Sequence, residues 1–259
     1  MLAGCLRYVG PVPRLQQTWR SIDGAEVVDA LAHGWLGRAL RLPGHILGRN
    51  TSISAAHEVT RMLANGFAYA QAEQVTGDYA EFGVHTGRTF VDAHRIARRF
   101  GRYPRRFYAL DSFQGLPEIT AIDAGHQWTA GQFAHDRASF EARLRRARIP
   151  AADVTIVEGF FDQTLAHAER IGLERVAFAW VDCDLYESTV PVLDYLTDRL
   201  VPGAVLAFDD WFCFRGARDR GESLACTEWL ERNPKISLVP WRQFHWAGQA
   251  FLVQRAAGD

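Results

Sequence analysis

A chain of 259 residues, of which 48% are hydrophobic and 23% charged, is long enough to bury a full core and has the composition of a globular protein. Its formal net charge of −1 and pI of about 6.8 provide no overall field that would attract nucleic acid or an anionic membrane. The composition therefore predicts one enzyme-sized domain that binds neither nucleic acid nor a membrane.

The first residues and the cysteine pattern favour a cytoplasmic protein. Residues 1–20 contain Leu and Val but are interrupted by Gly10, Pro11 and Pro13, which excludes a membrane-spanning helix and makes a poor signal peptide. The chain has four cysteines without C-x-x-C spacing: Cys5, Cys183, Cys213 and Cys226. Reduced thiols are therefore favoured over disulfides or a zinc site.

Residues 1–54 contain scattered Gly and Pro with short helical patches, such as 25–32, and are predicted to be an N-terminal extension. Apolar residues then follow a helical period over 55–72, until Gly77-Asp78 breaks the pattern. The main domain is accordingly predicted to cover residues 55–259.

From residue 79 onward, strand and helix patterns alternate. Strands are predicted at 79–84, 106–111, 154–157, 176–181 and 204–208, with helices between them at 89–100, 140–148, 162–171 and 188–200 and a turn at 201–203. A helix near 222–231 and strands near 236–240 and 249–254 complete the sheet. Such alternation predicts an α/β domain with a mostly parallel sheet.

Four carboxylates directly follow two apolar strands. Asp182 and Asp184 follow one of them, and Asp209 with Asp210 follows the next. A right-handed crossover makes these strands parallel neighbours, so all four acids are expected to meet at one edge of the sheet. Carboxylates converging in a partly dry cleft would repel one another and take up protons, so a divalent metal ion is the economical explanation.

Two further strand ends suggest a nucleoside cofactor. Gly83 and Gly87 lie in the turn after the first strand, where they would let the backbone approach a ligand. Asp111 ends the second strand and is placed to accept hydrogen bonds from ribose hydroxyls. Because the third glycine of G-x-G-x-x-G is missing, a cofactor without phosphates is favoured.

Each of these residues also has a purely structural interpretation. The glycines can be explained by tight turning alone. Asp111 and Asp209 can be helix N-caps, and Asp184 can cap the helix that begins near Ser188. Four histidines are more simply surface or hydrogen-bonded side chains than zinc ligands, because none pair at ligand spacing: His85, His126, His135 and His245.

Residues 77–255 resemble the macrocin O-methyltransferase family, S-adenosylmethionine-dependent enzymes of antibiotic sugar tailoring. The motifs that carry the resemblance are Glu81-Phe82-Gly83-Val84 with Gly87, the segment from Leu110 to Glu118, the segment from Val181 to Thr189, and Pro202-Gly203 through Phe208-Asp209-Asp210. The resemblance implies a class I methyltransferase fold. This is a Rossmann-like sandwich with a mostly parallel seven-stranded sheet and helices on both faces, here with a helical N-terminal extension.

The resemblance also implies roles for individual residues. Asp182, Asp209 and Asp210 match ligands of a divalent metal, expected to be Mg²⁺, and Asp184 matches a general base that works beside Asp182. The positions expected to contact S-adenosylmethionine are Glu81, Gly83, Gly87, Asp111, Ser112, Phe113, Gly159, Phe160, Phe161 and Asp182. The turn His85-Thr86-Gly87-Arg88 departs from the Trp-rich turn common in the family.

Methyl transfer to a hydroxyl would explain why acidic residues are needed at this site. A hard divalent cation lowers the pKa of a hydroxyl and fixes its direction of attack. Asp184 would take the proton, although a strand would point its side chain away from Asp182 unless the backbone has already left the sheet.

The segment 118–136 is long for a connection and is predicted to be a lid that closes over the acceptor, with Trp128 near the substrate. A disordered surface loop is the alternative. The acceptor is expected to be a sugar or diol hydroxyl of a natural product, and an apolar extension could mediate a homodimer.

Three other functions remain open. A glycosyltransferase also combines Asp-x-Asp with a metal, but it would not need Asp209-Asp210. An aspartyl-phosphate phosphatase has Asp-x-Asp after its first strand, whereas here it comes late. A non-catalytic nucleoside-binding protein remains possible if the metal site is incomplete.

Overall fold

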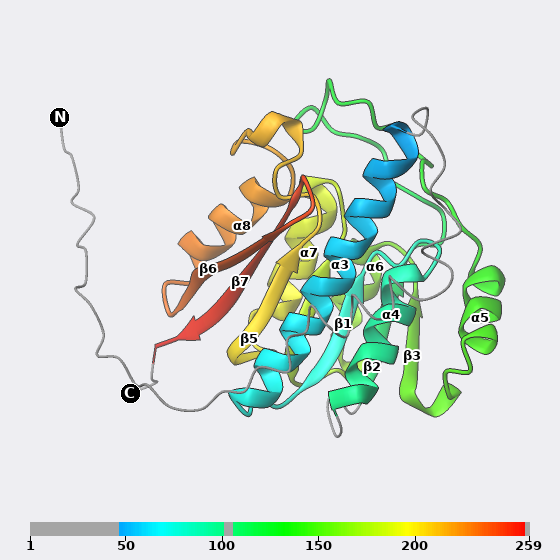
Figure 1. Cartoon of the computed structure of the whole chain (residues 1–259). Helices are drawn as coiled ribbons and strands as arrows, with labels where there is room; N and C mark the ends of the chain where they lie inside the picture. Colours follow the sequence, from blue (N-terminus) through cyan, green and yellow to red (C-terminus); the bar gives the residue numbers. More distant parts are fainter. Residues whose placement is uncertain (1–46, 101–105, 257–259) are drawn as a thin grey trace. The chain divides into compact units, whose positions relative to one another are not determined.

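The computed structural model describes residues 47–100 and 106–256. Seven strands form a single sheet in the order β3-β2-β1-β4-β5-β7-β6 (Figure 1). They are β1 (Asp78–Phe82), β2 (Phe107–Asp111), β3 (Val154–Glu158), β4 (Val176–Val181), β5 (Leu200–Phe208), β6 (Ile236–Phe244) and β7 (Gly248–Arg255). The first five strands are parallel, and β7 runs antiparallel to both β5 and β6. This confirms the predicted mostly parallel seven-stranded sheet.

Helices cover both faces of this sheet. The α-helices are α3 (Leu47–Ala72), α4 (Arg88–Ala97), α5 (Arg137–Arg146), α6 (Phe161–Thr164), α7 (Tyr186–Leu196) and α8 (Gly221–Arg232). Short 3-10 helices are η1 (Arg98–Phe100), η2 (Ala151–Asp153), η3 (Leu165–Arg170) and η4 (Phe214–Gly216). Helices α3, α4 and α5 pack on one face, and α7 and α8 pack on the other.

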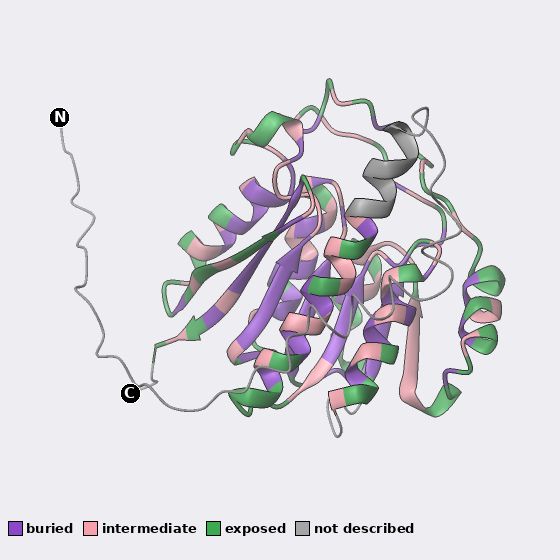
Figure 2. Cartoon of the chain, viewed as in Figure 1, coloured by how far each residue is buried: buried purple, intermediate pink, exposed green. Residues whose placement is uncertain are grey.

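The strand period of two explains how one sheet serves two cores. All six residues of β4 are buried. Phe178 and Trp180 pack in the cluster under α3 and α4, whereas Ala179 and Val181 pack in the cluster under α7 and α8. The central strands are accordingly buried along their length (Figure 2). Central strands of this kind read in sequence as continuous apolar runs, as predicted.

Several predicted boundaries differ from the structure. The predicted turn 201–203 lies within β5, where Gly203 adopts φ +80° and β5 shifts register against β4. The predicted helix 162–171 is one α-helical turn followed by η3, which kinks at His167. Helix α3 begins at Leu47 and crosses the predicted domain boundary at 54/55, while residues 1–46 of the predicted extension lie outside the described residues.

The cysteines that the structure describes form no disulfide. Cys183, Cys213 and Cys226 are free and buried, whereas Cys5 lies outside the described residues. Among the helices of residues 47–100 and 106–256, none is long and apolar enough to cross a membrane.

Candidate active site

A cavity of about 540 Å³ lies at the carboxyl edge of the parallel strands. Its walls come from the segments that follow β1, β2, β3, β4 and β5, as expected for a ligand site of an open α/β sheet. Seven residues predicted to contact the cofactor line this cavity: Gly83, Asp111, Ser112, Gly159, Phe160, Phe161 and Asp182. All four predicted acids also line it, namely Asp182, Asp184, Asp209 and Asp210.

Three residues predicted to contact the cofactor do not line this cavity. Glu81 is buried in β1, where it accepts a hydrogen bond from the hydroxyl of Tyr79 at 2.5 Å. Gly87 is the left-handed N-cap of α4, and a Cβ atom there would meet the ring of Phe140. Phe113 packs against that same ring, with centroids 5.7 Å apart. The structure therefore gives Gly87 and Phe113 packing contacts with Phe140, and gives Glu81 a buried hydrogen bond.

Asp111 links the end of β2 to the turn after β1. Its Oδ2 atom accepts hydrogen bonds from the amides of Val84 at 2.7 Å and His85 at 2.9 Å, and its Oδ1 atom accepts from Phe113 at 2.6 Å. The next helix along the chain, α5, begins only at Arg137, so the N-cap interpretation of Asp111 is wrong. Contact with ribose hydroxyls stays a prediction, supported by the position of Asp111 in the cavity wall.

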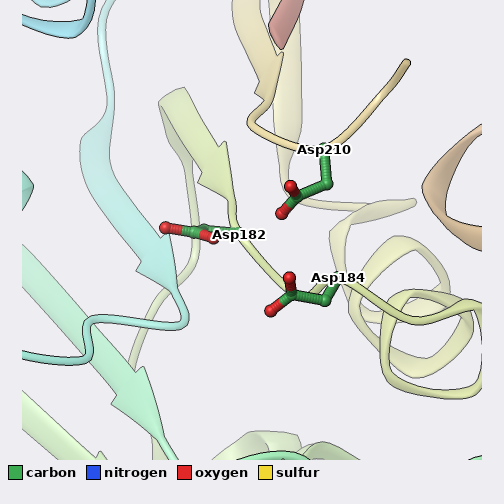
Figure 3. Close-up of side chains that lie close together, drawn as sticks. All are labelled: Asp182, Asp184 and Asp210. Atoms are coloured by element: carbon green, nitrogen blue, oxygen red, sulfur yellow. The ribbon is translucent and has the colours of Figure 1, made fainter. Parts of the chain in front are cut away.

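Three carboxylates converge beside this cavity. One oxygen from each of Asp182, Asp184 and Asp210 lies within 4.8 Å of the others. Figure 3 shows the carboxylates of Asp184 and Asp210 directed into the same space, with Asp182 beside them at the end of β4. Strand β4 ends at Val181, and Asp184 adopts φ +60°, so the backbone has left the sheet where Asp184 turns toward Asp182. The sequence predicted that Asp184 could reach Asp182 only if the backbone had left the sheet, and the left-handed conformation of Asp184 meets this requirement.

The N-cap interpretation of Asp184 is wrong. The N-cap of α7 is Leu185, and no side chain supplies a capping hydrogen bond from that position. The amide of Tyr186, in the first turn of α7, instead donates to Asp123 Oδ2 at 2.6 Å. Asp184 is therefore not used to begin this helix.

The electrostatics of the cluster favour either bound protons or a bound cation. Burial, followed by the charges of Asp209, Asp210 and its other acidic neighbours, raises the pKa of Asp182 well above its usual value. Burial and the charges of Asp210 and Asp209 act in the same direction on the pKa of Asp184. Burial, with the charge of Asp209, raises the pKa of Asp210 to about 7. A donor set made only of carboxylate oxygens fits a hard divalent cation, which would replace the protons.

Asp209 stands apart from the three converging acids. Its Oδ1 atom lies 3.2 Å from Nε2 of His245, and Nδ1 of His245 accepts a hydrogen bond from the amide of Ala247 at 3.1 Å. The close cluster thus contains Asp184, whereas the predicted ligand set contains Asp209; Asp182 and Asp210 belong to both. His245 is a buried, hydrogen-bonded histidine, in agreement with the sequence interpretation.

A second cavity of about 330 Å³ shares part of this wall. Asp209 and Asp210 line both cavities. The other walls come from residues 55–59 of α3, the first turns of α4 and the turn between β6 and β7. In that turn Trp246 is 73% exposed, which is unusual for so large an apolar side chain. Asp209 and Asp210 therefore lie between two cavities that are otherwise lined by different residues.

The segment 118–136 is anchored rather than loose. Asp123 is 1% exposed and binds backbone amides of two helices, and Arg220 donates to the carbonyl of Ala124 at 2.7 Å. Trp128 is buried with its ring 5.2 Å from that of Phe214, and it lines neither cavity. The alternative of a disordered surface loop is wrong, and Trp128 fixes the segment instead of forming a cavity wall.

Sequence reasoning missed two buried acids. Asp123 lies in an irregular segment, and Glu222 lies in the first turn of α8, where an acid is common because it suits the helix dipole. Periodicity predicts the inward face of a helix but not that a glutamate will occupy it. The sequence contains only a weak signal for Glu222: it stands next to Gly221, after the long irregular segment that follows Asp210.

The sheet order and the acid-lined cavity at its carboxyl edge define a class I methyltransferase fold. The O-methyltransferase NovP shares this fold with a TM-score of 0.62 at 21% identity, over 76% of this chain and 80% of NovP. The calicheamicin methyltransferase CalS11 aligns with a TM-score of 0.60 at 24% identity, over 94% of this chain and 99% of CalS11.

The chain belongs to the macrocin-O-methyltransferase (TylF) family, whose model matches residues 56–229. It is 33% identical over 147 residues to an 8-demethyl-8-(2,3-dimethoxy-alpha-L-rhamnosyl)-tetracenomycin-C 4'-O-methyltransferase from Streptomyces olivaceus, covering 54% of this chain and 55% of that relative. It is 30% identical over 158 residues to mycinamicin III 3''-O-methyltransferase from Micromonospora griseorubida, covering 58% and 61%. The chain thus spans little more than half the length of these relatives. The family predicted from the motifs is confirmed.

Proposed function

We propose that this protein is a metal-dependent S-adenosylmethionine O-methyltransferase that acts on a sugar or diol hydroxyl of a natural product. The observation that carries the proposal is the position of the acids, which stand between a cavity of cofactor size and a second cavity. Family membership supports the reaction class, and the names of both relatives refer to O-methylation.

The larger cavity is assigned to S-adenosylmethionine. Gly83 brings the backbone close to the ligand, and Asp111 offers its carboxylate to the ribose hydroxyls while it holds the turn after β1. Phe160 and Phe161 line the side next to β3 and offer apolar surface to the adenine ring. The reactive sulfonium is then expected near Asp182, at the end of β4.

The second cavity is assigned to the acceptor. An oxygen lone pair of the acceptor hydroxyl attacks the methyl carbon, and the carbon–sulfur bond breaks with its electron pair moving to sulfur. S-adenosylhomocysteine and a methyl ether are the products. The hydroxyl proton passes to Asp184, whose carboxylate lies beside those of Asp182 and Asp210. Holding the two substrates in line supplies much of the rate enhancement.

The cation is assigned to Asp182, Asp209 and Asp210, with Mg²⁺ as the metal. When bound, such a cation lowers the pKa of the acceptor hydroxyl and fixes its direction. A base for that hydroxyl must itself lie close to the ligand oxygens, so the presence of Asp184 in the close cluster agrees with the role of base.

The decisive experiment combines calorimetry with a methylation assay. We expect S-adenosylhomocysteine to bind with micromolar affinity, and acceptors carrying the sugars of the two relatives to gain one methyl group by mass spectrometry when Mg²⁺ is present. Binding of a nucleotide sugar alone would support a glycosyltransferase instead. Binding of S-adenosylhomocysteine without turnover of any acceptor would favour a nucleoside-binding protein, and full turnover in chelator would refute the metal.

Three finer assignments complete the proposal. We assign the protein to the cytoplasm and expect a homodimer, which light scattering coupled to size exclusion would detect. Segment 118–136 contributes Glu118 and Phe133 to the larger cavity and no residue to the second. It is therefore proposed as a lid over the larger cavity, with movement confined to its ends because Asp123 and Trp128 hold its centre. Equal protease sensitivity with and without both substrates would exclude this lid.

A further inference from the structure

Glu222 is a buried acid for which the proposed reaction has no use. Its side chain is 1% exposed and projects from the first turn of α8. Oε1 accepts a hydrogen bond from the amide of Cys183 at 3.2 Å, and Oε2 accepts one from the amide of Asp210 at 2.9 Å. Burying a carboxylate is costly unless hydrogen bonds compensate, so these contacts must account for its position.

The two amides that Glu222 binds belong to the two acidic segments. Cys183 lies between Asp182 and Asp184 after β4, and Asp210 follows β5. The carboxylate of Glu222 therefore links the acidic segment after β4 to the acidic segment after β5. This link adds to the pairing of β4 with β5, which ends at Val181 and Phe208. The amides of Asp182 and Asp209 still donate to the carbonyls of Phe82 and Val181, at 2.9 Å each, whereas the amides of Cys183 and Asp210 donate to Glu222.

Asp123 supplies the second half of the same arrangement. Its Oδ1 atom accepts from the amide of Gly221 at 2.8 Å, next to Glu222, and its Oδ2 atom accepts from the amide of Tyr186 at 2.6 Å. The short segment 183–186 is thus held at both ends, by Glu222 at Cys183 and by Asp123 at Tyr186. This explains how Asp184, between them, is kept in a left-handed conformation that non-glycine residues seldom adopt.

We propose that Glu222 is a positioning residue that sets the spacing of the carboxylates for a divalent cation, with Asp123 in a supporting role. The inference rests on the cation of the proposed function but adds residues that touch neither cavity. The outer partners of metal ligands commonly determine metal affinity, because they orient the ligands before the ion arrives. Glu222 orients two ligand-bearing segments through their backbone.

The test is Glu222→Gln, which keeps the shape of the side chain. An amide has one acceptor oxygen, so its NH₂ group would face one of the two backbone N–H donors and that contact would become repulsive. We expect the Mn²⁺ affinity of the purified protein, measured by electron paramagnetic resonance titration of free Mn²⁺, to fall by about 10- to 100-fold. The affinity for S-adenosylhomocysteine should change by less than about threefold, since Glu222 does not line the cavity.

Glu231→Gln is the matched control, because it removes the same charge from an exposed position on the same helix. It should leave Mn²⁺ affinity unchanged. Asp123→Asn provides a second variant in case Glu222→Gln does not fold, and we expect a smaller loss of Mn²⁺ affinity from it because Asp123 binds the amides of Tyr186 and Gly221 and not those of Cys183 and Asp210.

The outcomes separate this inference from the proposed function. If the wild-type protein binds no Mn²⁺, the metal in the proposed function fails, and this inference fails with it. If the wild type binds Mn²⁺ and both Glu222→Gln and Asp123→Asn bind it equally well, the proposed function stands but the positioning role is overturned. A parallel loss of S-adenosylhomocysteine and Mn²⁺ affinity would also overturn it, because it would indicate general damage to the fold.

Discussion

His245 donates a hydrogen bond to Asp209. The amide of Ala247 donates to Nδ1 of His245, so the proton of the neutral ring lies on Nε2, which faces Asp209 Oδ1 at 3.2 Å. Both ring nitrogens are engaged, and neither lone pair is free to take a proton from an acceptor. His245 is therefore suited to orienting Asp209 and not to serving as the base.

This arrangement makes the roles of Asp184 and Asp209 separable. We expect Asp184→Asn to retain Mn²⁺ binding within about tenfold while turnover falls by about 100-fold or more, because the proton acceptor is lost. Asp209→Asn should instead weaken Mn²⁺ binding by about tenfold or more. Mn²⁺ titration and steady-state assays on both variants check this. If Asp184→Asn lost Mn²⁺ binding and Asp209→Asn kept it, Asp184 would be a metal ligand and not the base.

Metal-free protein should become less stable as the pH rises. The folded-state pKa values of Asp182, Asp184 and Asp210 lie above their ordinary values, so the folded protein holds protons that the unfolded chain has released. That stabilisation is complete below the ordinary pKa and is lost as the pH rises through the folded-state pKa, about 7 for Asp210. We expect the Tm in chelator to fall between about pH 5 and about pH 8, and saturating Mg²⁺ to offset the fall.

The control for this pH dependence is an exposed acid. Asp219→Asn should leave the slope of Tm against pH unchanged, because its side chain is 81% exposed. Asp210→Asn should flatten the slope in chelator. A Tm that rises over this pH range in the metal-free wild type would contradict the assigned shifts.

Gly83 should tolerate no side chain. It adopts φ +89°, and a Cβ atom there would collide with the carbonyl oxygen of Asp182. Gly125 adopts a similar φ of +87°, yet a Cβ atom would meet nothing within 4 Å. Both Gly→Ala variants incur the backbone cost of roughly 1 kcal/mol, so their difference isolates the collision. We expect only Gly83→Ala to lose S-adenosylhomocysteine binding and to show the larger drop in Tm; equal Tm values would remove the steric argument.

The two cavities should respond to different aromatic residues. Trp246 lines the second cavity and Phe133 lines the larger one, and both rings are exposed. Trp246→Ala should raise the KM for the acceptor by about tenfold, equivalent to about 1.4 kcal/mol, without changing the affinity for S-adenosylhomocysteine. Phe133→Ala should instead weaken the binding of S-adenosylhomocysteine and leave the KM for the acceptor unchanged. If Trp246→Ala altered only cofactor affinity, the acceptor could not be assigned to the second cavity.

The sequence predicted the sheet and the edge at which the site lies, because apolar runs and the acids that follow them are local signals. It could not predict which acids converge. That depends on the left-handed backbone at Asp184 and on the hydrogen bond that holds Asp209 to His245, a residue far along the chain. Glu222 was missed for a related reason, since its role arises only when α8 packs against the ends of β4 and β5.

The β6–β7 hairpin has a practical consequence for engineering. Its turn brings residues 245–247 to the second cavity, whereas none of these three lines the larger one. Under the proposed assignment, this turn contacts the acceptor and not the methyl donor, while Asp209 and Asp210 line both cavities. Grafting a different turn between β6 and β7 should redirect the enzyme to new natural products while the donor site is inherited unchanged.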